Sequence, residues 1–290
     1  AIAVTKIVKR MIKKTFMPRL YHLWYNLGKF EEDIFGMNKR LWIVLGVLVV
    51  ATFGGLMWYR NVTEENDPVA YASELDGTKL ITKDDIIAAQ EKTLGRSLTD
   101  EEKDNIIEDH YDGPTDAKVV VVEWEDFACS HCQAFQTYAE QIKEDYKDRV
   151  LFIVRDFSLN YPNSIATLSA GNAVAKLGGN EAFWKMSEQL FQDEKWISQA
   201  VPNSERKELF EEYAKNAGVD VDEFNQLLNN TDNNGIQDKI DRDKRLGENL
   251  GVTGTPTWMV NGEKVDGTTE ENIRNAIEEA LAESKKTDGE

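Results

Sequence analysis

The alternation of hydrophobic and polar positions divides the chain into stretches of different character. Leu41 to Tyr59 is a run of 19 residues without a charge, which is long enough to span a bilayer core as a helix. The run is longer than the apolar region of a signal peptide, which has about 7–15 residues, and its C-terminal flank is bulky rather than small. We therefore expect residues 41–59 to form a retained transmembrane helix.

Basic residues concentrate on one side of this run. Lys39 and Arg40 precede it, and Arg60 is the only basic residue that follows closely. The positive-inside rule then predicts that residues 1–40, a basic amphipathic segment, lie in the cytoplasm and that everything after residue 60 lies outside it.

Residues 60–115 are polar and form a predicted connector. Thr82 and Thr99 each precede an acidic residue at the third following position, which is the signal of a capped helix. Both predicted helices have few apolar residues, so we expect them to pack weakly on the main domain or to serve as a stalk. His110 is expected in a solvated loop.

A strand–helix–strand pattern begins after Lys118. Val119–Trp124 and Val150–Arg155 are apolar enough for strands of a sheet that is covered on both faces, and Gln133–Tyr146 has helical spacing. The short links predict a parallel βαβ unit with a right-handed crossover.

A long helical block and a hairpin complete the chain. Asn261-Gly262 is a two-residue turn signal between the predicted strands 257–260 and 263–265, and 269–284 is a final helix. Five segments with helical spacing precede the hairpin: 164–177, 181–192, 204–216, 220–228 and 236–250. The predicted fold is α/β, with a domain built from 116–160 and 246–285 and a helical insertion at 161–245.

Charge changes this picture by excluding one class of partner. The net charge is −18, but residues 1–40 carry nine Lys/Arg against three Asp/Glu, a net charge of +6, while the other 250 residues carry 25 against 49, a net charge of −24. An acidic body argues against nucleic acid, because phosphate binding needs Lys and Arg. The basic head fits anionic lipid.

The chain has two cysteines, Cys129 and Cys132, spaced as C-x-x-C directly after the first predicted strand. Cys129 is expected at a helix N-terminus, where the helix dipole and free N–H groups favour a thiolate. A lone C-x-x-C outside the cytoplasm indicates redox or metal chemistry.

Three other interpretations of the pair are weaker. A zinc site needs four Cys or His ligands, and His22, His110 and His131 are the only histidines. Covalent haem needs His directly after the second cysteine, where this chain has Gln133. A structural disulfide would close too small a loop to stabilise much.

The segment 230–235 faintly resembles a calcium loop, but we interpret it as a helix–helix turn because it lacks the first Asp and the last Glu.

The order βαβ, helical insertion, ββα, with C-x-x-C at the first strand–helix junction, resembles the thioredoxin fold with an inserted helical domain. It is similar to the DsbA-like thiol:disulfide oxidoreductases, and in particular to their membrane-anchored BdbD-type branch. The similarity covers roughly residues 115–285. It is carried by Glu123-Trp-Glu-Asp-Phe-Ala-Cys129-Ser-His-Cys132, Glu181-Ala-Phe-Trp184 and Gly251-Val-Thr-Gly-Thr255-Pro256-Thr-Trp-Met-Val-Asn-Gly262.

The resemblance implies a role for each matching residue. Cys129 corresponds to the nucleophile that bonds to substrate, and Cys132 to the buried resolving cysteine. Pro256 corresponds to a cis-proline that faces the pair, with the Thr255 backbone presented to substrate.

Glu123 corresponds to a buried acid that helps to move the proton of Cys132, whereas Glu125 and Asp126 are expected as exposed acids at the strand end. His131 corresponds to the histidine between the cysteines of the most oxidising members. Many members have Pro where this chain has Ser130, which leaves the redox potential open.

The function that the resemblance implies is a dithiol oxidase of the bacterial cell membrane, acting outside the cytoplasm on exported proteins that contain cysteine. It implies reoxidation by a quinone-linked membrane protein of the DsbB type. No cofactor is expected beyond the redox-active Cys129–Cys132 disulfide. Two alternatives remain: a reductase or isomerase of the same fold, and a non-catalytic binding domain or chaperone.

Overall fold

The computed structural model describes residues 67–161, 163–197, 202–230 and 234–287. The predicted cytoplasmic segment 1–40, the predicted transmembrane helix 41–59 and the first residues of the predicted connector lie outside these ranges. Within them, every helix is too short or too polar to cross a bilayer.

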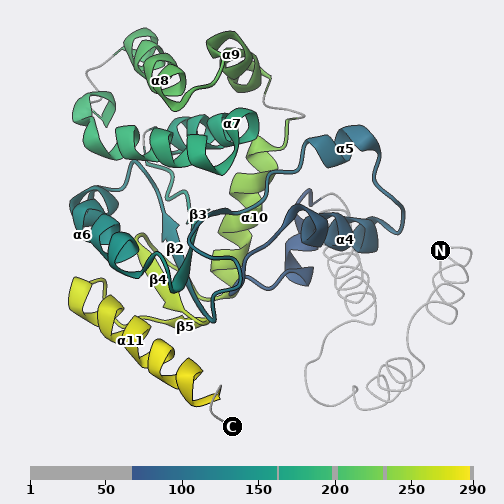
Figure 1. Cartoon of the computed structure of the whole chain (residues 1–290). Helices are drawn as coiled ribbons and strands as arrows, with labels where there is room; N and C mark the ends of the chain where they lie inside the picture. Colours follow the sequence, from purple (N-terminus) through teal and green to yellow (C-terminus); the bar gives the residue numbers. More distant parts are fainter. Residues whose placement is uncertain (1–66, 162, 198–201, 231–233, 288–290) are drawn as a thin grey trace, which may run out of the picture. The chain divides into compact units, whose positions relative to one another are not determined.

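A five-stranded mixed sheet forms the centre of the described part (Figure 1). The strands lie in the order β1-β3-β2-β4-β5; β2 and β3 are parallel, and the other neighbouring pairs are antiparallel. Their bounds are β1 His110–Asp112, β2 Val119–Glu125, β3 Val150–Asp156, β4 Thr257–Val260 and β5 Glu263–Lys264. The predicted βαβ unit and hairpin are confirmed. Asn261 and Gly262 both have positive φ, at 46° and 85°, as a tight hairpin turn requires.

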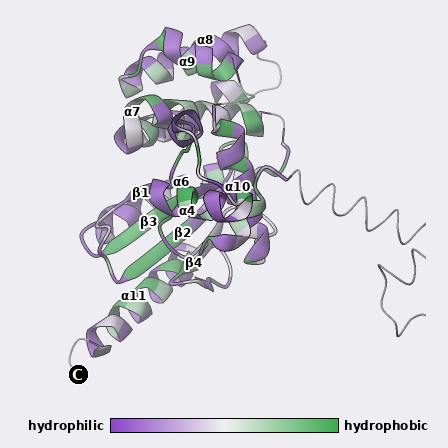
Figure 2. Cartoon of the chain, turned by 90° about the vertical axis from the view of Figure 1, so that its right-hand side faces the viewer, coloured by the Kyte–Doolittle hydropathy of each residue, from purple (hydrophilic) through white to green (hydrophobic). Residues whose placement is uncertain are grey.

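Helices cover both faces of the sheet (Figure 1). Figure 2 shows β2 and β3 as hydrophobic strands between helices of mixed polarity. Alternate residues of β2 serve different layers: Val119 and Val121 pack with α6 and α11, while Val122 and Trp124 pack on the opposite side. The helices are α6 Ser130–Tyr146, α7 Ser164–Gln192, α8 Asn203–Ala217, α9 Val221–Asn229, α10 Ile236–Asn249 and α11 Glu270–Thr287, with short 3-10 turns η1 Ala70–Glu74 and η2 Glu194–Ile197.

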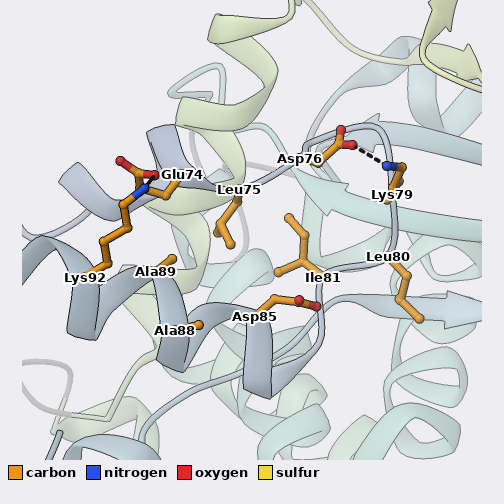
Figure 3. Close-up of a pocket in the computed structure, with 10 residues that line it drawn as sticks. All are labelled: Glu74, Leu75, Asp76, Lys79, Leu80, Ile81, Asp85, Ala88, Ala89 and Lys92. Atoms are coloured by element: carbon orange, nitrogen blue, oxygen red, sulfur yellow. Dashed lines mark hydrogen bonds and ion pairs between the residues drawn. The ribbon is translucent and has the colours of Figure 1, made fainter. Parts of the chain in front are cut away.

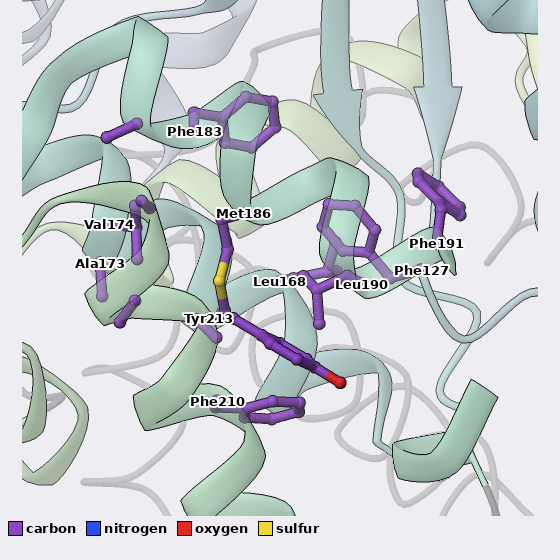
Figure 4. Close-up of a cluster of buried hydrophobic side chains, with 14 of the residues drawn as sticks. Phe127, Leu168, Ala173, Val174, Phe183, Met186, Leu190, Phe191, Phe210 and Tyr213 are labelled. Carbon is purple, nitrogen blue, oxygen red and sulfur yellow. The ribbon is translucent and has the colours of Figure 1, made fainter. Parts of the chain in front are cut away.

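The helical insertion has its own hydrophobic cluster, in which side chains of α7, α8 and α9 meet (Figure 4). Phe127, which follows β2, and both cysteines belong to the same cluster. The dithiol thus lies where the sheet meets the insertion. The two helices predicted at 164–177 and 181–192 are one run, α7, broken at Gly179, where φ is 74° and ψ is −166°.

The predicted connector is packed more tightly than expected. Helices α4 (Lys83–Leu94) and α5 (Asp100–Asp104) have the predicted capping boxes at Thr82 and Thr99. The expectation of weak packing or a stalk is wrong for α4, because apolar side chains of η1 and α4 are buried in a cluster that includes Leu246 of α10. It holds for α5, which has no buried residue. The buried side chain of Arg155 in β3 also donates hydrogen bonds to two backbone carbonyl oxygens of this connector, those of Gly77 and Lys79.

His110 also differs from the prediction. It lies in β1, is 3% exposed, and its ring stacks on Phe183 with centroids 3.7 Å apart. Its Nε2 is 2.8 Å from Oδ1 of Asn172. Both partners come from α7, more than 60 residues away, so no local pattern could reveal this burial.

Candidate functional site: a dithiol at the start of helix α6

Cys129 is the N-cap of α6, and Cys132 lies within its first turn. The helix begins at Ser130 rather than at the predicted Gln133, and Gln133 N donates to Cys129 O at 3.0 Å. Both thiols are free and buried, with Cys129 1% and Cys132 3% exposed.

The surroundings move the two thiol pKa values apart. The hydrogen bond with Cys132 lowers the pKa of Cys129 from 9.0 to about 4, aided by Thr255 and by the backbone N–H groups of Cys132 and His131. Burial raises the pKa of Cys132 well above 9.0. The site is built to hold one thiolate and one thiol.

The Thr255–Pro256 loop faces the dithiol from the other end of the chain. The peptide bond between the two residues is cis, as the resemblance implied. Thr255 O lies 3.4 Å from Cys129 Sγ, so residues 126 positions apart meet at the reacting sulfur. The loop is held by two side-chain hydrogen bonds, from Thr257 Oγ1 to Gly254 O and from Thr268 Oγ1 to Pro256 O.

His131 has an exposed side chain. The contribution that the structure shows from this residue is its backbone N–H, which helps to lower the pKa of Cys129. The predicted role of its imidazole stays a prediction.

Glu123 lies on the face of β2 that packs against α6 and is 3% exposed. Its Oε2 is 3.4 Å from Lys143 Nζ of α6, and Lys143 also lies over the ring of Trp184 at 4.7 Å. Burial raises the pKa of Glu123, in agreement with the expected buried acid. Its predicted role in moving the Cys132 proton is not tested by this geometry.

Glu125 and Asp126 contradict the expectation of exposed acids, with 2% and 0% exposure. Asp126 Oδ2 accepts from Ser164 Oγ at 2.6 Å and from Leu159 N at 3.2 Å, and its Oδ1 accepts from Ala128 N. Chain segments that follow β3 thus close over the end of β2. Sequence reasoning missed this because Leu159 and Ser164 lie more than 30 positions away.

Burial raises the pKa of Glu125 well above its usual value of 4.5, and Glu123 adds to this effect. Its Oε1 is buried and has no hydrogen-bond partner in the described part of the chain. The negative charge of Glu125 is also one of the influences that raise the pKa of Cys132.

Two other features lie outside this site. A pocket of about 380 Å³ between η1 and α4 is lined by connector residues alone, with Lys79 paired to Asp76 at 2.9 Å (Figure 3). The possible calcium loop includes residues 231–233, which are outside the described ranges. Within those ranges no three His, Cys, Asp or Glu side chains are grouped to hold a metal ion.

Comparison with known proteins gives three informative matches. A family described as thioredoxin matches residues 105–279, more than half of the chain. Probable disulfide bond formation protein D of Bacillus cereus is 31% identical over 160 residues, which is 52% of this chain and 68% of that protein. The crystal structure of oxidised BdbD from Bacillus subtilis shares the fold, with a TM-score of 0.51, 22% identity, and coverage of 60% of this chain and 93% of that one.

A further relative has a different architecture. Na(+)/H(+) antiporter NhaA 1 of Mycolicibacterium vanbaalenii is 28% identical over 156 residues, which is 53% of this chain. The chain spans only 23% of that antiporter's length, so the match concerns one part of a longer protein.

Proposed function

We propose that this chain, which belongs to the thioredoxin superfamily and to its DsbA-like thiol:disulfide oxidoreductases, is a dithiol oxidase for exported proteins. The observation that carries the proposal is the opposite direction of the two thiol pKa shifts, down to about 4 for Cys129 and upward for Cys132. A stabilised thiolate stabilises the reduced form. The Cys129–Cys132 disulfide is then a strong oxidant.

The reaction begins with attack of a substrate thiolate on Cys129 Sγ. The Cys129–Cys132 bond breaks, and a mixed disulfide forms between Cys129 and the substrate. A second substrate thiolate then attacks the substrate sulfur and releases Cys129 as a thiolate. The substrate has lost two electrons, and the cysteine pair has gained them.

The proposed setting is the outer side of the bacterial cell membrane. It is supported by the apolar run 41–59 and the basic residues before it. The proposed partners are exported proteins that contain cysteine and a quinone-linked membrane protein of the DsbB type that takes up the two electrons. The proposal needs no cofactor beyond the cysteine pair.

Equilibration of the chain with glutathione at known ratios tests the direction of the reaction. We expect a potential nearer to that of DsbA, about −120 mV, than to that of thioredoxin, about −270 mV. A potential as low as that of thioredoxin contradicts the oxidase and favours the reductase or isomerase. C129S should abolish exchange with a peptide dithiol, and unchanged activity of this variant would instead support a non-catalytic binding domain.

A further inference from the structure

Two buried carboxyl groups lie on the same face of β2. Glu123 and Glu125 are two residues apart, so both point toward the layer that contains α6. Because β2 ends where the turn into α6 begins, α6 runs back along the strand (Figure 1). The first turn of α6 therefore lies nearest the end of β2 that carries Glu125.

The buried side of α6 connects the dithiol to a lysine. Cys132 and Lys143 are both buried and are eleven residues apart, which is about three helical turns and roughly 16 Å. Lys143 forms an ion pair with Glu123 at 3.4 Å. This contact places the Lys143 end of the buried stripe beside Glu123, whereas Glu125 is the glutamate of β2 whose charge acts on Cys132 at the other end.

Glu125 has no such partner. Oε1 of Glu125, like Oε2 of Glu123, is buried with no hydrogen-bond partner among the described residues, but of these two side chains only Glu123 has an ion pair within those residues. The charged groups that act on it are Glu123 and Asp126 of its own segment, Asp156 of β3, and Lys143 of α6. Three of these four are acids, so a proton on Glu125 relieves like-charge repulsion as well as the cost of burial.

We propose that Glu125, rather than Glu123, is the group that gives a proton to Cys132 Sγ when the Cys129–Cys132 disulfide opens and takes it back when the disulfide re-forms. This inference rests on the proposed thiol–disulfide exchange at Cys129.

The proton transfer balances the opening step. The substrate thiolate attacks Cys129 Sγ, the substrate–Cys129 bond forms, and the Cys129–Cys132 bond breaks with its electron pair on Cys132 Sγ. The Glu125 carboxylic acid then transfers its proton to that sulfur. The products are the mixed disulfide, the Cys132 thiol and the Glu125 carboxylate.

The direction of the pKa values suits this exchange. The pKa of Glu125 is raised well above 4.5, so its carboxyl group keeps a proton at pH values where an ordinary glutamate has lost it. The pKa of Cys132 is raised well above 9.0, so the departing sulfur is a strong base that takes the proton.

The test is the pH profile of the rate at which reduced glutathione opens the disulfide of the oxidised chain, expressed per glutathione thiolate and followed by tryptophan fluorescence. In the unmodified chain the rate should fall as pH rises and Glu125 loses its proton. E125Q should remove this falling limb and slow the reaction roughly tenfold to a hundredfold on the acid side of the limb. E123Q should retain the limb, and so should E140Q, which changes an exposed acid of α6.

A falling limb that persists in E125Q would overturn the inference, whatever E123Q does. Failure of the proposed function looks different, since the potential of the cysteine pair in equilibrium with glutathione would then lie near that of thioredoxin, whatever the pH profile of E125Q. Thermal unfolding of oxidised E125Q checks that the variant is folded. Because the raised pKa of Glu125 costs stability as pH rises above 4.5, E125Q should lose less stability between acid and neutral pH than the unmodified chain.

Discussion

Cys129 and Cys132 carry the same thiol, and the fold moves their pKa values in opposite directions. The N-cap position places Cys129 among backbone N–H groups and beside the Cys132 thiol. Cys132, one turn later, is enclosed by apolar side chains, and the charge of Glu125 helps to raise its pKa. At the scale of single residues, three positions along one helix separate a nucleophile from a proton-holding thiol.

C132A should raise the pKa of Cys129, because the hydrogen bond from Cys132 is the largest cause of its lowering to about 4. We expect an upward shift of about one unit or more, measured from the ultraviolet absorbance of the thiolate in the reduced chain. A midpoint that stays near 4 would show that Thr255 and the backbone N–H groups at the helix N-terminus suffice to lower the pKa. E140Q, on the exposed side of α6, is the control.

The same pKa fixes a pH dependence of stability. Between pH 4 and 9 the folded reduced chain binds fewer protons at Cys129 than the unfolded chain does. The stability gained is complete above the ordinary value of 9.0 and is lost as pH falls through about 4.

At the scale of elements, the break in α7 shapes the insertion. Gly179 has φ 74° and ψ −166°, a conformation that is nearly restricted to glycine. A Cβ built there meets no atom within 4 Å, so a substitution is opposed by backbone strain and not by a clash.

G179A should therefore destabilise the chain by about 1–3 kcal/mol, measured by denaturant unfolding. K185A, an exposed change in the same helix, should stay within about 0.5 kcal/mol. Equal stability of the two variants would mean that α7 can straighten at no cost.

At the scale of the whole described part, buried charges join elements that are far apart in the sequence. Asp109, just before β1, contacts Arg155 of β3 at 2.6 Å and Arg242 of α10 at 3.3 Å. Arg242 also contacts Asp243 at 2.9 Å, and Asp243 pairs with Lys239. These contacts tie the connector and α10 to the sheet that carries the dithiol.

D109A should cost about 3–5 kcal/mol, because it leaves two buried guanidinium groups without their shared carboxylate. D76A removes an exposed ion pair with Lys79 and should cost at most about 1 kcal/mol. Chemical denaturation compares them. Similar losses for the two variants would mean that the connector is not held by this network.

Local signals identified most of the elements and the dithiol. The apolar run of β2, the capping threonines and the Asn-Gly turn act over a few residues, so the sequence shows them directly. The resemblance added the distant partner Thr255–Pro256. The burial of His110, Glu125 and Asp126 was missed, because each is covered by side chains from elements that only the fold brings close.

The sequence by itself determined where the strands and helices form and which thiol begins a helix, since propensity, capping and spacing are short-range properties. Only the tertiary structure decided that Glu123 forms an ion pair with Lys143 and that Glu125 is the carboxyl group whose charge acts on Cys132. That outcome depends on how α6 lies along β2, and this register is set by packing across the interface rather than by neighbours in the chain.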